Sequence, residues 1–230
     1  MPVAPLTLDE AVDRLIHRIR GQKPYLVFTP NPEMIDRSMR DDAFRRQLLL
    51  ADLRVADGVG LVWASRLFRT PLPGTVPGVD LMDALLAACP GTGVFLLGTT
   101  PPVVQEAANR AAQRGVRVAG FHHGFFSAEE EPSLVDLIWR CAPGLILSGM
   151  GIPRDQAFAE RWRDRLPPGV YLAVGGGLDI LAGHAQRAPR GVRRLGMEWL
   201  YRLISSPRRW RRQIALPRFA WNVLYRRFLM

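Results

Sequence analysis

The sequence predicts an α/β protein: a Rossmann-like, mostly parallel sheet with helices on both faces, followed by a basic amphipathic helical appendage at the C-terminus. Short apolar runs of strand length alternate with segments of helical spacing at least five times, which is typical of a parallel sheet. Several of these runs end in glycine-rich or polar turns. Arginine and aromatic residues then gather in the last segment. We therefore expect an α/β domain over 1–190 and a basic, aromatic-rich appendage over 191–230.

The composition is that of an ordinary globular chain. Its 230 residues suffice to bury a core, and 48% of them are hydrophobic. The two cysteines, Cys89 and Cys141, provide neither a disulfide framework nor a metal site, so we expect buried thiols in a reducing compartment. There is no apolar run of about eighteen residues and no signal-type N-terminal segment. We therefore expect a cytoplasmic protein without a spanning helix.

Each element follows from local periodicity and from the turns that bound it. Apolar residues at helical spacing, with Thr7 or Asp9 as a cap, predict a first helix over 8–19. The next expected elements are a strand at 25–28, a helix at 33–47, a strand within the apolar run 48–55 and a helix at 61–68. After a Pro/Gly-rich loop at 71–78 come a helix at 79–89, a strand in 93–100, a helix at 103–113 and a strand at 116–120. The last are a helix at 130–139, a strand at 145–148, a helix to about 165 and a strand at 170–174.

Four of the strand ends carry polar or glycine-rich turns, at Thr29, Asp57, Gly98 and Gly175. Because the carboxyl ends of parallel strands lie on one edge of an open sheet, we expect these turns to converge where ligands bind. Asp57, in the turn Ala56-Asp57-Gly58-Val59-Gly60, is then a candidate general base. A helix cap or a turn hydrogen bond is the alternative role for this carboxylate. The convergence of the turns favours catalysis.

The other turns suit phosphate and sugar groups. Thr29 and Asn31 precede a helix N-terminus and suit hydroxyls or phosphate, with a capping turn as the simpler alternative. Gly175 and Gly176 belong to three adjacent glycines, which allow a ligand to approach the backbone closely. Asp179 can accept a hydrogen bond from a ribose or a base. The spaced glycines of a dinucleotide fingerprint are absent, which disfavours a NAD site.

Two adjacent histidines, His122 and His123, raise the question of a metal. Neighbouring residues of one strand rarely face the same ion, and no matching cluster of Cys or His accompanies them in the sequence. We therefore expect no metal site.

The C-terminal segment holds the excess positive charge of the chain. The net charge is +10, and twelve arginines but only one acid, Glu198, lie from Arg187 to the end. The arginines are interleaved with Trp, Phe and large aliphatic residues, as in amphipathic helices of a membrane interface. Each basic side chain adds about 1 kcal/mol of attraction to an anionic surface. We expect membrane binding rather than nucleic-acid binding or a solvated tail, because large aliphatic residues suit acyl chains.

Together, the motifs resemble the WecG/TagA/CpsF glycosyltransferases of bacterial cell-surface polymer synthesis. The matching segments follow the order of that family and cover nearly the whole chain. They are TPN at 29–31, ADGVG at 56–60, PGVDL at 77–81, FLLG at 95–98, GFF at 124–126, GMGIPR at 149–154, GGGLD at 175–179 with AG at 182–183, RAP at 187–189, and EWLYR at 198–202 with PRR at 207–209.

The resemblance implies an inverting, metal-independent enzyme that needs no cofactor. It would move a hexose or N-acetylhexosamine from a UDP-sugar to a polyprenyl-diphosphate-linked sugar on the inner face of the plasma membrane. The expected partners are these two substrates, an anionic membrane surface and other polysaccharide-assembly enzymes, and not nucleic acid.

The resemblance also implies roles for particular residues. Asp57 would be the general base on the acceptor hydroxyl, with Thr29 and Asn31 beside it. The residues lining the UDP pocket would be Gly98, Phe125, Gly175, Gly176 and Asp179. The arginines that close over the diphosphate, where Arg can replace a metal, would be Arg202, Arg209 and Arg212.

Three places depart from the pattern of that family. Thr75 stands where the family usually has Arg, Phe125 where it has Tyr, and Asp155-Gln156 where it has Gln-Glu. We assign Asp155 and Gln156 to the acceptor side, and Asp155 is a second candidate base. The sequence leaves open whether the sugar is N-acetylmannosamine, glucose or another hexose. A non-catalytic UDP-sugar-binding scaffold is the alternative function.

Overall fold

The computed structural model describes residues 1–189, 191–192, 197–198, 200–201 and 214–228. Its centre is one six-stranded sheet in the order β2-β1-β6-β5-β3-β4, and every pair of neighbouring strands is parallel. The strands are β1 (Pro24–Phe28), β2 (Leu53–Arg54), β3 (Val94–Gly98), β4 (Val118–His122), β5 (Leu145–Gly149) and β6 (Gly169–Ala173). The prediction of a mostly parallel, Rossmann-like sheet is confirmed.

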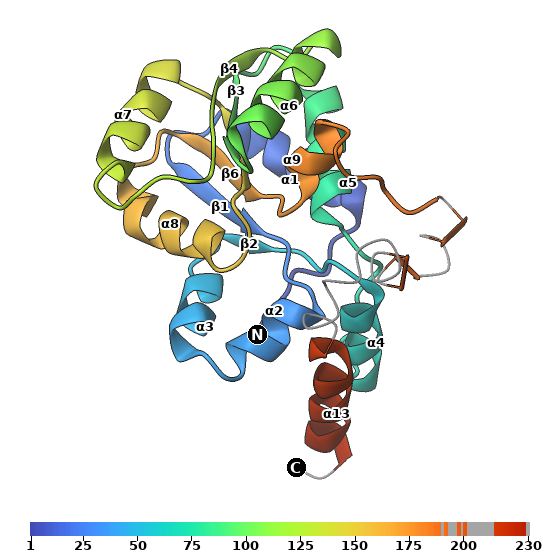
Figure 1. Cartoon of the computed structure of the whole chain (residues 1–230). Coiled ribbons are helices and arrows are strands. Elements are labelled where there is room, and N and C mark those ends of the chain that lie inside the picture. The colour runs from blue at the N-terminus through green and yellow to red at the C-terminus, as the bar shows by residue number, and fades with distance from the viewer. Residues whose placement is uncertain (190, 193–196, 199, 202–213, 229–230) are drawn as a thin grey trace.

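Helices cover both faces of the sheet (Figure 1). The helices packed on one face are α1 (Leu8–Ile19), α5 (Gly78–Ala88), α6 (Pro101–Gln113) and α9 (Gly177–Leu181). Those on the other face are α2 (Pro32–Ser38), α3 (Asp42–Leu49), α7 (Glu131–Cys141) and α8 (Arg154–Trp162), which the 3₁₀ turn η1 (Arg163–Arg165) follows. The described part of the chain also contains the helices α4 (Val59–Leu67) and α13 (Ala215–Phe228).

The alternation of side chains along each strand builds two cores. On β1, Leu26 and Phe28 join the core under α3, α7 and α8, whereas Val27 joins the core under α1, α5 and α6. Because both faces are covered, the strands β1, β3, β5 and β6 contain no charged residue, as expected for a parallel sheet.

Three sequence-based boundaries are wrong. The single helix predicted over 33–47 is two helices, because Asp41 caps a new helix by accepting a hydrogen bond from the Phe44 amide at 2.9 Å. The predicted strand in 48–55 shrinks to β2, since Leu48 and Leu49 complete α3. The strand predicted at 116–120 begins and ends two residues later, so His122 belongs to β4 and not to a loop.

The predicted cap of the first helix is confirmed. Thr7 caps α1, and together with Glu10 it forms a capping box. Cys89 and Cys141 are free, but they are half-buried and not fully buried as expected.

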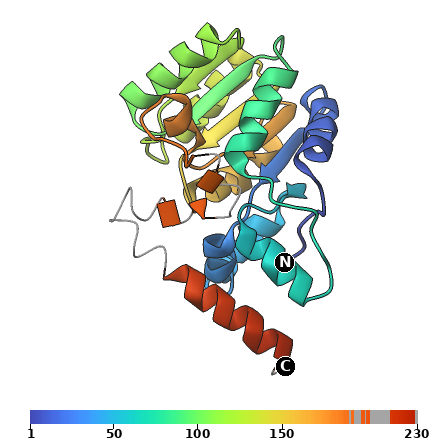
Figure 2. The ribbon, with the colours of Figure 1, turned by 90° about the vertical axis from the view of Figure 1, so that its right-hand side faces the viewer.

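The C-terminal helix α13 packs against α2 and α4, at the end of the molecule opposite α6 and α7 (Figures 1 and 2). Its inward side chains Phe219 and Val223 join Leu61 and Ala64 of α4 in a small separate core. None of the helices within the described ranges is both long and apolar enough to cross a membrane.

Candidate active site at the carboxyl edge of the sheet

Asp57 lies at the carboxyl end of β2, in a turn fixed by two backbone hydrogen bonds. Its own amide donates to the Pro30 carbonyl at 2.9 Å, and the Val76 amide donates to the Ala56 carbonyl at 2.7 Å. Gly58 follows with φ of 98°, a conformation that only glycine adopts readily. Asp57 is half-buried. The turn therefore holds this carboxylate between the ends of two other segments, one after β1 and one before α5.

The neighbouring strand end brings Thr29 and Asn31 beside that turn. Thr29 is buried, and a Cβ on Gly78 would lie 2.9 Å from its Oγ1, so Thr29 lies against the N-terminus of α5. The side chain of Asn31 caps α2 by accepting a hydrogen bond from the Met34 amide at 3.0 Å. This is the capping role that the sequence left open for Asn31.

A second group of site residues lies farther along the same edge. Gly98 has φ of 139°, and a Cβ there would lie 2.4 Å from the carbonyl carbon of Gly149, so only glycine fits between these two backbones. Thr99, which follows it, has φ of 50° and donates from Oγ1 to Oδ1 of Asp179 at 2.8 Å. Sequence reasoning missed Thr99, and a threonine after a strand-ending glycine was the available signal.

The triple glycine follows β6, between these two groups of residues. Gly175 has φ of 53°, and Gly176 and Gly177 lead into α9, whose first turn contains Asp179. The sheet order puts four strand spacings between the ends of β2 and β3, about 19 Å along the edge. Asp57 and Asp179 therefore suit different parts of one long ligand, or two ligands.

Asp155 and Gln156 are each only 1% exposed, in the first turn of α8. The Asp155 carboxylate accepts hydrogen bonds from Ser148 Oγ at 2.6 Å and from the Met150 and Gly151 amides at 3.0 Å each. Burial raises the pKa of Asp155 to about 7, and these donors oppose the shift. In this arrangement the carboxylate fixes the loop after β5, and its contact with a substrate stays a prediction.

Phe125 projects from the loop after β4 and is 64% exposed. The guanidinium of Arg154, at the start of α8, lies 5.9 Å from its ring centroid and 5.5 Å from that of Phe126. An aromatic face and a cation next to the strand ends suit a base and a phosphate. Sequence reasoning did not single out Arg154 as a site residue, although it closes the GMGIPR motif.

An ion pair ties the chain after α9 to the helix beside Thr29. Arg187 Nη1 lies 2.6 Å from Oδ1 of Asp80, in the first turn of α5, and this hydrogen bond raises the pKa of Arg187. The pair brings the beginning of the C-terminal segment toward the carboxyl edge.

Some of the predicted residues cannot be located in this way. Arg202, Arg209 and Arg212 lie outside the residues that the structure describes. Within the described part of the chain, no three His, Cys, Asp or Glu side chains are grouped so that they could hold a metal ion.

Comparison with known proteins identifies the relatives of this chain. Residues 1–229 match the glycosyl transferase WecG/TagA/CpsF family. A relative from Bacillus spizizenii is 31% identical over 206 residues, which cover 88% of this chain and 79% of the relative. A relative from Staphylococcus aureus strain MW2 is 34% identical over 200 residues, which cover 86% and 78%. Both are named N-acetylglucosaminyldiphosphoundecaprenol N-acetyl-beta-D-mannosaminyltransferase.

The parallel sheet, its edge of polar turns and these matches define a hexosyltransferase. More particularly, the chain belongs to the WecG/TagA/CpsF family of glycosyltransferases.

Proposed function

We propose that this protein is an inverting, metal-independent glycosyltransferase of cell-surface or exopolysaccharide synthesis. It transfers a hexose or N-acetylhexosamine from a UDP-sugar to a polyprenyl-diphosphate-linked sugar. The relatives are named for transfer to a diphosphoundecaprenol-linked sugar, which supports this class of acceptor. The observation that carries the proposal is the carboxylate of Asp57, half-buried in a glycine turn at the ligand-binding edge of the sheet.

The reaction needs one proton acceptor and one stabilised leaving group. Asp57 removes the proton from the acceptor hydroxyl as its oxygen attacks the anomeric carbon of the donor. The bond between that carbon and the diphosphate oxygen breaks on the opposite face, UDP departs with the bonding electrons, and the configuration inverts. Thr29 lies close enough to the Asp57 turn to orient the acceptor.

UDP is proposed to bind at the other end of the edge. Thr99 orients the Asp179 carboxylate, which leaves its second oxygen for a ribose hydroxyl or the base. Phe125 and Arg154 offer a ring face and a cation to the nucleotide. By the resemblance, Arg202, Arg209 and Arg212 neutralise the departing diphosphate in place of a metal.

The acceptor lipid implies work at the inner face of the plasma membrane. On α13, Trp221 and Phe228 are 67% and 66% exposed, and Arg226 lies on the same helix. Exposed aromatic rings with nearby arginines suit an anionic interface. We therefore propose peripheral attachment through the C-terminal segment.

A ligand screen combined with a transfer assay tests the function. We expect UDP and UDP-sugars to raise the melting temperature of the full chain, and Asp179→Ala to abolish most of that rise. A matched Asp164→Ala variant, changed at an exposed acid of η1, should retain it. Transfer of a sugar from a UDP-sugar to a prenyl-diphosphate-linked acceptor should then be observed. UDP binding without transfer to any such acceptor would instead indicate a scaffold.

A further inference from the structure

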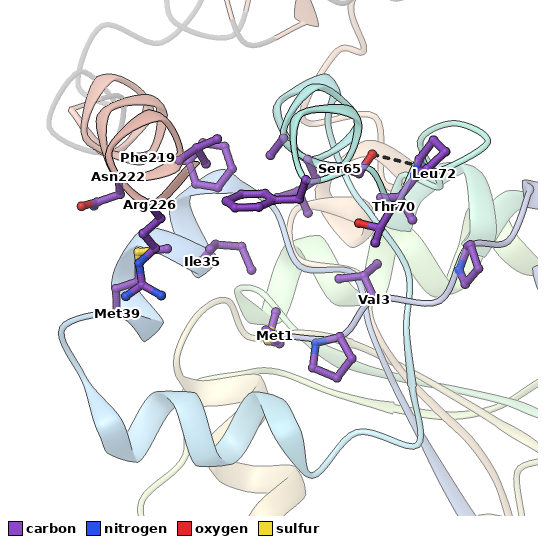
Figure 3. Close-up of a pocket in the computed structure, with 17 residues that line it drawn as sticks. Met1, Val3, Ile35, Met39, Ser65, Thr70, Leu72, Phe219, Asn222 and Arg226 are labelled. Carbon is purple, nitrogen blue, oxygen red and sulfur yellow. Dashed lines mark hydrogen bonds between the residues drawn. The ribbon is translucent and has the colours of Figure 1, made fainter. Parts of the chain in front are cut away.

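An apolar cavity lies between α2, α4, α13 and the N-terminal residues, next to the Asp57 turn. Its volume is about 660 Å³, within the range of pockets that bind small molecules. Figure 3 shows Phe219 of α13, Ile35 of α2 and Val3 facing this space from three sides. Other hydrocarbon side chains in its wall are Leu61, Leu72 and Val223.

Four of the 17 residues that line the cavity have polar side chains: Ser65, Thr70, Asn222 and Arg226. The Ser65 hydroxyl in its wall already donates to the Val62 carbonyl at 2.7 Å and accepts from the Leu72 amide at 3.0 Å. A sugar or a base placed here would lose hydrogen bonds to water and find little replacement, which is costly. A hydrocarbon chain would lose nothing of that kind and would gain from leaving water.

The mouth of the cavity reaches the surface. Met39 and Phe68 line it and are 36% and 43% exposed. Arg226 of α13 lies at its border, where Figure 3 shows the guanidinium beside Met39. An apolar interior with a cationic border suits an amphiphile with an anionic head.

One wall of the cavity also packs against the proposed catalytic turn. A Cβ on Gly60 would lie 3.6 Å from Cε1 of Phe219, a lining residue. Ala56, which precedes Asp57, packs in the same apolar cluster as Phe219 and Val223. Leu61, the lining residue nearest to Asp57 in sequence, follows it by four positions.

We propose that this cavity binds the isoprene units nearest the diphosphate of the acceptor lipid. The inference rests on the proposed function and extends it by giving the hydrocarbon chain its own site. With these units held there, the diphosphate lies at the border of the cavity, beside Arg226. Trp221 and Phe228, the outward rings of α13, can then contact the bilayer that holds the rest of the lipid's hydrocarbon chain.

Binding of short, water-soluble prenyl diphosphates to the full chain tests this site. By calorimetry in detergent-free buffer, we expect farnesyl diphosphate to bind at least tenfold more tightly than inorganic diphosphate. Phe68→Asp puts a charge into the mouth and should weaken farnesyl diphosphate binding at least tenfold. Phe121→Asp makes the same change at an exposed ring of β4 outside the cavity and should alter it less than twofold. Met39→Trp, which narrows the mouth at an exposed position, should also weaken it.

Three results would overturn the proposal. One is equal affinity for farnesyl diphosphate and diphosphate. Another is equal effects of Phe68→Asp and Phe121→Asp. The third is oleate competing as well as farnesyl diphosphate, which would indicate a general acyl-chain site. Circular dichroism checks that each variant is folded. These outcomes are independent of turnover. Absence of sugar transfer by the wild-type protein refutes the proposed function. If transfer is observed but farnesyl diphosphate binds no more tightly than diphosphate, only this site is refuted.

Discussion

Arg218 of α13 lies 3.3 Å from Oδ2 of Asp36 on α2, a carboxylate that is only 1% exposed. The same oxygen accepts a hydrogen bond at 2.6 Å from Nη2 of Arg40, which lies two residues beyond the end of α2. The C-terminal helix is thus held by a charge buried in the sheet domain as well as by its apolar side chains Phe219 and Val223.

Arg218→Ala should loosen α13 without unfolding the protein. The Arg218 side chain is 47% exposed, so solvent screens the pair and its loss should cost about 0.5–1 kcal/mol. We expect faster amide hydrogen exchange across 215–228 and little change in the melting temperature. Arg40→Ala is the matched control. Arg40 pairs with the same Asp36 carboxylate, but it does not belong to α13. Equal acceleration of exchange in both variants would mean that the Arg218 pair does not hold this helix.

Asp57→Asn should preserve the fold and lower sugar transfer by roughly 10²- to 10⁴-fold, the usual contribution of a general base. The amide of residue 57 would still donate to the Pro30 carbonyl, so the turn should persist. Steady-state rates with saturating donor measure the effect, and thermal unfolding checks the fold. Asp164→Asn, an exposed acid in η1, should leave the rate unchanged. A rate for Asp57→Asn within about threefold of wild type would assign the base to another group.

The fold could be predicted because its signals are local. Alternating apolar runs fix the number of strands before residue 174, and their shared direction puts Thr29, Asp57 and Gly175 on one edge. Asp41 shows the limit of such reasoning. An acid in the middle of a helical pattern indicates a surface residue of one continuous helix. In the structure Asp41 instead accepts a hydrogen bond from the Phe44 amide, and this cap divides the helix in two.

Contacts between distant segments could not be predicted. The strand order, with β6 between β1 and β5, depends on how helices pack and leaves no local signal. The bond between Thr99 and Asp179 joins residues 80 positions apart, and the Arg218–Asp36 pair joins opposite halves of the chain. The sequence could therefore nominate strand-end residues but not identify their partners.

The buried carboxyl of Asp155 should make stability depend on pH in an unusual direction. Burial raises the pKa of Asp155 from 3.8 to about 7. Between those values the folded chain retains a proton that the unfolded chain releases, so the contribution of this group is full below about pH 4 and is lost as the pH rises toward 7. The difference in melting temperature between wild type and Asp155→Asn should narrow by on the order of 5 °C from pH 5 to pH 8. A difference that widens with pH would mean that the donors around the carboxylate outweigh its burial.

Thr99→Val should weaken UDP binding by freeing the carboxylate that the threonine orients. Valine keeps the shape of threonine but removes the hydroxyl, so the 2.8 Å bond to Asp179 Oδ1 is lost. A hydrogen bond to a charged group is worth about 1.5–3 kcal/mol, and part of that loss should appear as a five- to twentyfold higher dissociation constant for UDP. Calorimetry measures it. The neighbouring Thr100 is exposed and makes no capping bond from its side chain, so Thr100→Val is the matched control and should bind UDP as wild type does.

Thr99→Gly separates the hydroxyl from the backbone conformation. Because Thr99 is itself strained at φ of 50°, Thr99→Gly should stabilise the backbone while weakening UDP binding to the same extent. Unchanged affinity in both Thr99 variants would remove Asp179 from the proposed nucleotide site.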